Sequence, residues 1–110
     1  MGWPGGLFLD HELADLLNLP ARSSGYIVKT VAKGSPGDQI GLRGGRMIVR
    51  IAGQDVPLGG DIILSVEGLA ASPANLAKIR DMLGRLPPGT PFKVSVLRAG
   101  QVLELTGTLQ

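Results

Sequence analysis

Residues 60–68 read Gly60-Asp61-Ile62-Ile63-Leu64-Ser65-Val66-Glu67-Gly68, and this apolar run sets the fold class. Its isoleucines and valine favour extended backbone, and residues 61–66 contain almost no polar side chain. A strand of this kind is buried on both faces, whereas a strand with one solvated face alternates apolar and polar residues. Glu67-Gly68 then turns the chain. The sequence therefore predicts a domain with a buried strand over residues 61–66.

A second strand is predicted upstream, over Gly25-Tyr26-Ile27-Val28-Lys29-Thr30-Val31, because this segment is rich in β-branched and aromatic residues. The turn residues Gly34-Ser35-Pro36-Gly37 close it. A single helical turn is expected from Asp38 to Gly41.

Two hairpins are predicted. In the first, Met47-Ile48-Val49-Arg50-Ile51 and Val56-Pro57-Leu58 flank a turn at residues 52–55, and Pro57 suits only an edge strand. The second closes the chain at Ala99-Gly100. Its alternating apolar residues are Phe92, Val94 and Val96, and its last strand covers residues 102–106.

The principal helix begins at Ser72-Pro73, an N-cap residue followed by proline at the first helical position. Its apolar residues, spaced by three and four, are Leu76, Ile79, Leu83 and Leu86. Pro87-Pro88-Gly89 ends it.

The N-terminal region predicts a glycine loop that leads into a short strand, over Gly5-Gly6-Leu7-Phe8-Leu9. Asp10 is then expected to cap a short helix that ends by Pro20. The leucines expected on one face of this helix are Leu13, Leu16 and Leu17. Adjacent glycines leave backbone amides uncovered, so the loop is a candidate nest for an anion such as a peptide's terminal carboxylate.

Length and composition agree with one small β-rich domain. The chain has 110 residues, of which 44% are hydrophobic, and carries a formal net charge of +2 without any run of like charge. Scattered charge disfavours nucleic-acid binding. The absence of cysteine excludes disulfides and thiolate metal sites. No apolar run is long enough to span a bilayer, and Met1-Gly2-Trp3-Pro4 is unlike a signal peptide, as expected for a domain cut from a longer chain.

Catalytic and metal chemistry find little support. His11 is the only histidine, it stands beside Asp10 and Glu12 at a helix start, and a solvated polar role explains it best. No nucleophile elbow, zinc-binding motif or calcium-loop spacing occurs. Lys33-Gly34-Ser35 lacks the spaced glycine of a phosphate loop and predicts a turn. We therefore expect neither catalytic residues, nor metal, nor cofactor.

The order of motifs resembles the PDZ domains that follow the protease domain in the bacterial HtrA (DegP-like) serine proteases. The matching segments are Leu13 to Pro20, Gly25 to Val28, Gly34 to Gly37, Gly41 to Gly45, Gly60 to Ile63, Val66 to Gly68, Pro88-Gly89 and Val94 to Gly100. The resemblance covers nearly all of the chain and implies one α+β domain over residues 1–110, a small, partly open β-barrel capped by two helices.

Two departures accompany the resemblance. The segment Arg46 to Gly59 intervenes where the family usually leads directly to Gly-Asp, so it is expected to be an inserted hairpin at the rim. The loop Trp3-Pro4-Gly5-Gly6-Leu7 fits the family's carboxylate loop only loosely, which leaves the binding amides open by one residue.

The resemblance also implies a peptide site between the strand after the glycine loop and the principal helix. The residues it assigns to this site are Gly5, Gly6, Leu7, Phe8, Leu9, Leu76, Ala77, Ile79, Arg80 and Leu83. Among the helix residues, Leu76, Ile79 and Leu83 form one stripe that favours a core role, while Ala77 and Arg80 lie beside it and could face a ligand.

The function implied is a non-catalytic module that captures C-terminal ends of polypeptides by β-strand addition, as a recognition or regulatory domain of a periplasmic serine protease. Its partners would be C-terminal peptides and the protease domain of the parent chain. Three alternatives remain open: a structural module whose groove holds a segment of its own parent, a remnant of an enzyme site, and a PDZ domain of a site-two or tail-specific protease. In the family, selection of serine or threonine third from the ligand's end uses a histidine at the helix start. Residues 72–76 contain none, which favours an apolar ligand residue there.

Overall fold

The computed structural model describes residues 5–17, 25–51 and 53–108. In chain order the elements are β1 (Gly5–Phe8), α1 (His11–Leu16), β2 (Tyr26–Thr30), α2 (Pro36–Gln39), β3 (Met47–Ile51), β4 (Gln54–Leu58), β5 (Ile62–Val66), β6 (Leu69–Ala70), α3 (Pro73–Arg85), β7 (Pro91–Arg98) and β8 (Gln101–Thr108). The terminal hairpin, the hairpin β3–β4 and the principal helix all form where the sequence predicts them.

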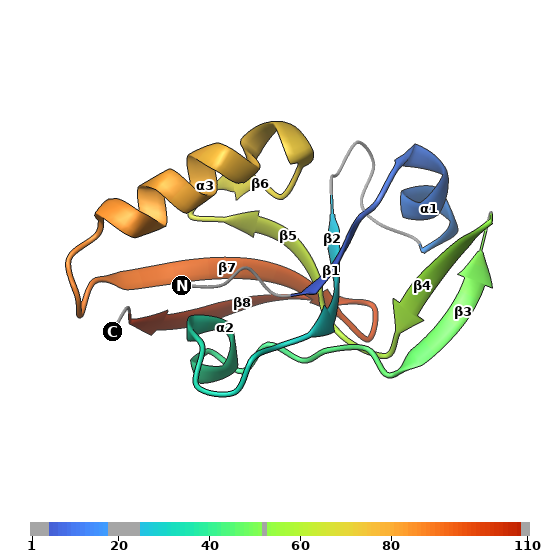
Figure 1. Cartoon of the computed structure of the whole chain (residues 1–110), viewed down its shortest axis with the longest axis horizontal. Helices are drawn as coiled ribbons and strands as arrows, with labels where there is room; N and C mark the ends of the chain where they lie inside the picture. Colours follow the sequence, from blue (N-terminus) through green and yellow to red (C-terminus); the bar gives the residue numbers. More distant parts are fainter. Residues whose placement is uncertain (1–4, 18–24, 52, 109–110) are drawn as a thin grey trace.

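The main sheet is antiparallel and follows the order β1-β2-β5-β7-β8, with β6 paired to β5 off this path (Figure 1). Strand β5 has neighbours on both sides, and Ile62, Ile63 and Val66 are buried as expected. Ala99 and Gly100 both have positive φ, 51° and 80°, which is the geometry of a tight turn between twisted strands. The α+β, PDZ-like architecture predicted for the chain is confirmed.

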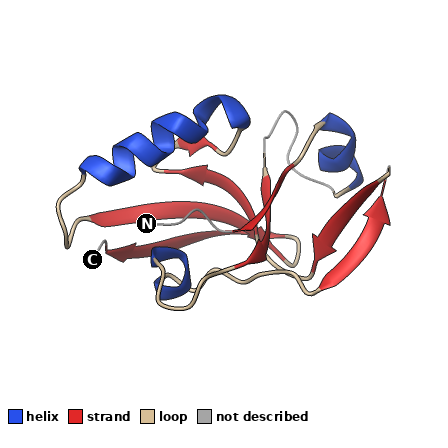
Figure 2. Cartoon of the chain, in the orientation of Figure 1, coloured by secondary structure: helices blue, strands red, loops and turns tan. Residues whose placement is uncertain are grey.

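Helix α3 covers one side of the sheet (Figure 2). It begins after the N-cap Ser72 with Pro73 in its first turn, and its residue Ile79 is fully buried against the sheet. The core cluster that includes Ile79 also contains Tyr26, Val28, Ile40, Leu42, Ile63, Val66, Ala71, Phe92, Val94 and Val96. This cluster is the main hydrophobic core.

A second, smaller core lies between the sheet and the hairpin β3–β4. It consists of Leu13, Ile27, Val56 and Ile62, with Leu7, Leu9, Leu17, Ile51, Leu58, Leu64 and Leu97 packed against it. Val56 is fully buried, as is Pro57, although the hairpin forms a separate two-stranded sheet. The hairpin is therefore not only a rim feature, since its second strand supplies core residues.

The expected apolar face of α1 differs in one residue. Asp10 caps the helix as predicted, its Oδ1 accepting a hydrogen bond from the Leu13 N–H at 2.8 Å. Leu13 is buried, and Leu17, one turn further on, packs against the second core. Leu16 is 57% exposed, because this short helix turns only the Leu13–Leu17 stripe inward. Pro20 lies outside the described residues.

The two ends of the β3–β4 hairpin meet where residues 43–45 cross residues 59–61. A Cβ on Gly60 would collide with the backbone at Gly44 and Gly45, and a Cβ on Gly44 would collide with the Lys29 carbonyl. We call this crossing the glycine neck. The strands can approach so closely here only because these positions have no side chains.

A buried ion pair holds the glycine neck to the sheet. Asp61 is fully buried, and its carboxylate accepts hydrogen bonds from Arg98 Nε at 2.6 Å and Nη2 at 2.7 Å. The Arg43 N–H donates to Asp61 Oδ2 at 3.0 Å, and Arg98 Nη2 also donates to the Gly41 carbonyl at 2.8 Å. The hydrogen bonds to Asp61 raise the pKa of the Arg98 guanidinium above its ordinary value. The arginine thus remains protonated at any pH the protein meets.

Asp61→Asn tests how much this ion pair contributes to the stability of the fold. The substitution keeps the shape of the side chain but leaves the partly buried guanidinium of Arg98 without a counter-charge, so we expect the free energy of unfolding to fall by about 3 kcal/mol. Urea denaturation measures it. The matched control is Asp81→Asn in the exposed Asp81–Arg85 pair, where both side chains are more than half exposed and the expected loss is below about 0.5 kcal/mol. Equal losses in both variants would contradict the assignment.

Val56→Ala tests whether the hairpin belongs to the core. Removing two buried methyl groups from the second core should lower the free energy of unfolding by about 2 kcal/mol. In contrast, Ile48→Ala on the facing strand truncates a side chain that is 49% exposed, and we expect a loss below about 1 kcal/mol. Thermal and urea unfolding of both variants provide the comparison, and a negligible effect at Val56 would show that the hairpin is dispensable.

Candidate functional site

Strand β1 lies at one edge of the main sheet and pairs on its inner side with β2. Gly5 and Gly6, expected in a loop, are already part of this strand, and neither has a positive φ. Their lack of side chains has a packing reason: a Cβ on Gly6 would collide with the Ile27 carbonyl, and one on Gly5 with Thr30 Oγ1. A register shift between Gly5 and Gly6 marks the point where this close pairing begins. Trp3 and Pro4 lie outside the described residues.

The pairing register determines which amides of β1 are turned outward. The Leu9 N–H donates to the Gly25 carbonyl at 2.8 Å, so this pair exchanges its hydrogen bonds with β2. Because such pairs alternate along antiparallel strands, the polar groups of Leu7 also face β2, and those of Gly6 and Phe8 face the open edge. Consistently, the Val28 N–H, opposite Gly6, bonds away from β1 to the Asp61 carbonyl at 2.9 Å.

The side chains of β1 alternate between the two cores. Phe8 packs against the main core and meets the Tyr26 ring edge-on, with the ring centroids 4.8 Å apart. Leu7 and Leu9 point the other way and pack against the second core. The strand is therefore fixed from both faces, while one of its edges has no partner strand among the described residues.

Helix α3 carries the other half of the predicted site. Ile79 is fully buried and Leu83 packs half-buried against the main core, as the stripe predicted. Leu76 is half-buried but belongs to neither core cluster, and Ala77 and Arg80 are exposed. Leu76, Arg80 and Leu83 are spaced by four and three, so they follow one side of the helix. Leu76, Ala77 and Arg80 are thus the helix residues of this set with surface to offer a ligand.

Other chemistry is not assembled in the described part of the chain. No group of three or more histidine, aspartate and glutamate side chains that could hold a metal ion occurs there. His11 is the first residue of α1. None of the described helices has the length and apolar character needed to cross a membrane.

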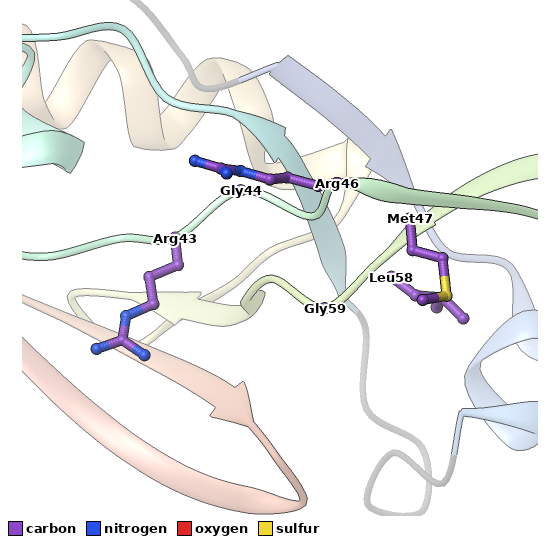
Figure 3. Close-up of a pocket in the computed structure, with 6 residues that line it drawn as sticks. All are labelled: Arg43, Gly44, Arg46, Met47, Leu58 and Gly59. Atoms are coloured by element: carbon purple, nitrogen blue, oxygen red, sulfur yellow. The ribbon is translucent and has the colours of Figure 1, made fainter.

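Two hollows are lined by described residues, none of which belongs to β1 or α3. One, of about 730 Å³, is lined by Leu17, Ile27, Arg43, Leu58, Gly59, Gly60, Asp61, Ile62, Leu97, Arg98, Ala99 and Gly100. The other, of about 510 Å³, lies at the start of β3 and is lined by Arg43, Gly44, Arg46, Met47, Leu58 and Gly59 (Figure 3). No binding role was predicted for these positions from the sequence.

Comparison with known proteins identifies relatives across the whole chain. No family model matches it. A probable periplasmic serine endoprotease, DegP-like, of Hahella chejuensis (strain KCTC 2396) is 28% identical over 106 residues, which is 94% of this chain and 19% of that protein. The solved HtrA-type protease AlgW with a decapeptide is 30% identical, with a TM-score of 0.59 over 97% of this chain.

The chain is similar to HtrA-type proteases over nearly its whole length. A second structure of AlgW, with a tripeptide, is 29% identical with a TM-score of 0.53 over 96% of this chain. The chain spans 28% and 30% of the two solved AlgW chains, so the similarity covers less than a third of each. The resemblance stated from the sequence is confirmed.

Sequence reasoning named β1 and α3 but could not distribute roles among their residues. The direction of each amide depends on the register between β1 and β2, and no residue pattern in Gly5-Gly6-Leu7-Phe8-Leu9 encodes it. In the sequence, Gly5 and Gly6 suggested an anion-binding loop. In the described structure, the absence of their side chains allows the close approach of β2.

Proposed function

We propose that this domain captures the C-terminal ends of polypeptides by adding them as a strand to the open edge of β1. The proposal rests on the open edge of β1. The backbone N–H and C=O groups of Gly6 and Phe8 face away from β2, and no described strand pairs with β1 on that side. An unpaired edge offers hydrogen bonds to an extended peptide in a ready-made register. The two AlgW structures, with a decapeptide and a tripeptide, support a peptide-binding role for this kind of domain.

An added antiparallel strand would place its C-terminus near the beginning of β1. There Gly5 and Gly6 are exposed, with no side chain between their amides and a carboxylate. The side chain of Leu7 would hold β1 in place by packing against the second core, while its amide faces β2. Phe8 and Leu9 would extend the strand along which the peptide lies. Leu76, Ala77 and Arg80 would form the exposed wall on α3, with Ile79 and Leu83 supporting it from below.

The domain itself would be non-catalytic, and its parent a bacterial serine protease of the HtrA type acting in the periplasm. The similarity to a periplasmic DegP-like endoprotease supports this assignment. In that setting the partners are the exposed C-termini of substrate or regulator proteins and the protease domain of the same chain. Peptide capture would then select substrates or regulate cleavage.

The affinity expected from this geometry is modest. About five backbone hydrogen bonds, a charge-assisted set at the carboxylate and one buried apolar side chain sum to on the order of 10 kcal/mol. Association costs of at least about 4 kcal/mol leave about 6 kcal/mol, which corresponds to a Kd of tens of micromolar. Such an affinity suits transient sampling of many chain ends.

The carboxylate requirement is tested with one apolar peptide prepared as a free acid and as a terminal amide. We expect the acid to bind at least about tenfold more tightly, because the amide loses the charge-assisted bonds near Gly5. Amide chemical-shift titration reports both affinity and location. Shifts should concentrate in β1 and α3 and spare β8, an edge strand that serves as the internal control. Equal affinity of the two peptides would contradict the proposal.

The preference at the third-last ligand residue is tested with two peptides that differ only there, by valine or threonine. The start of α3, residues 72–76, contains no histidine to bind a hydroxyl, Asn75 Nδ2 already donates to the Ala70 carbonyl at 3.0 Å, and Leu76 is apolar. We expect the valine peptide to bind roughly threefold or more tightly, as one additional buried methyl group would provide. Competition binding measures the ratio. Tighter binding of the threonine peptide would show that α3 is not the wall.

A further inference from the structure

A second unpaired strand edge lies in the hairpin β3–β4, at one end of the molecule (Figure 1). Strand β4 lies against β2, so β3 is the outer strand of the hairpin and has no partner on its far side among the described residues (Figure 1). Pro57 has no N–H and stands opposite Ile48, which makes Ile48 and Arg50 the residues that turn their polar groups outward. The hairpin thus presents two outward-facing N–H groups and two carbonyls.

Apart from Arg50, this edge lacks the features that protect strand edges from further pairing. Met47 is 65% exposed and Ile48 is 49% exposed, and no charged residue interrupts Met47-Ile48-Val49. The comparison with β8 is instructive: that edge strand carries Glu104 and Thr106, and the segment that includes α2 and Ile40 packs against it. The β3 edge is therefore suited to a partner.

The charge around β3 indicates what kind of partner fits. Residues 43–59 contain three arginines and one aspartate, a net charge of +2 that equals the formal charge of the whole chain. Arg50 meets Asp55 only at 3.7 Å, with both side chains more than two-thirds exposed, so this ion pair is weak and solvated. Arg46 is exposed beside the hollow that Met47 and Leu58 line, and its side chain extends away from both (Figure 3).

We propose that β3 binds an extended acidic segment of another polypeptide, in which glutamate or aspartate alternates with apolar residues. The backbone of the segment would pair with Ile48 and Arg50. Because side chains alternate along a strand, its acidic side chains would meet Arg46 and Arg50 on one face and its apolar side chains would cover Met47 and Val49 on the other. A second copy of this chain fits poorly, since pairing β3 with itself would bring the arginines of both copies together. This site is separate from β1 and needs no free carboxyl terminus.

The probe is a hexapeptide of alternating glutamate and valine, acetylated and amidated so that it cannot present a terminal carboxylate to β1. Its matched control replaces each glutamate with lysine. Amide chemical shifts of the wild-type protein should move over residues 46–51 with the glutamate peptide and not with the lysine peptide.

The protein variants exchange the charge. In Arg46→Glu/Arg50→Glu the preference should invert, with the glutamate peptide weakened roughly fivefold or more and the lysine peptide now binding at β3. Lys33→Glu/Lys78→Glu makes the same change of net charge at exposed positions elsewhere and should keep the wild-type preference. The inversion distinguishes the assigned contacts from a general effect of protein charge.

Three results would overturn the proposal. The first is equal shifts with both peptides, and the second is shifts confined to β1 and α3, which would place the probe in the other site. The third is self-association of the free protein through β3, detected by sedimentation velocity and abolished by Arg50→Pro, which would make a second copy the occupant.

Discussion

The carboxylate of Asp61 is the contact on which the arrangement of this domain depends. It joins three segments that are far apart in the sequence: the start of β5, the loop at Arg43 and the end of β7 at Arg98. Burying a carboxylate away from water costs folding free energy unless its oxygens accept hydrogen bonds. Here they accept them from the Arg98 guanidinium and from a backbone N–H. The backbone of Asp61 adds bonds to Arg43 and Val28. The central strand, the glycine neck and the terminal hairpin are thus placed relative to one another by one residue.

The elements that sequence reasoning predicted well are those encoded by local patterns. Helix α3 follows from Ser72-Pro73 and apolar residues spaced by three and four, and the terminal hairpin follows from alternating residues around Ala99-Gly100. What local patterns cannot encode is pairing at a distance. The bond between Asp61 and Arg98, the register of β1 on β2 and the burial of Val56 each depend on residues brought together only by the fold. The sequence predicted which residues form the candidate site. Which of their amides face outward could be derived only from the register of β1 on β2.

The two open edges are linked through the second core. Leu7 and Leu9 form the back of β1, and they pack into the same cluster as Val56 and Leu58 of the hairpin. A polar link runs alongside, since Gln54 Nε2 donates to Oδ2 of Asp10 at 3.3 Å while the other oxygen of that carboxylate caps α1. The hairpin and the strand on which peptide capture is proposed are therefore joined by packed side chains and by a polar contact.

The glycine neck has a consequence for how this domain can change in evolution and in the laboratory. The ends of the hairpin, near Gly45 and Gly60, touch through their backbones alone, so the chain between them closes a loop whose entropy varies slowly with its length. Sequence within that loop can diversify or be exchanged without disturbing the sheet, provided that apolar residues still fill the places of Ile51, Val56, Pro57 and Leu58. The neck is in effect a graft junction, where a new recognition surface can be installed beside an unaltered main sheet.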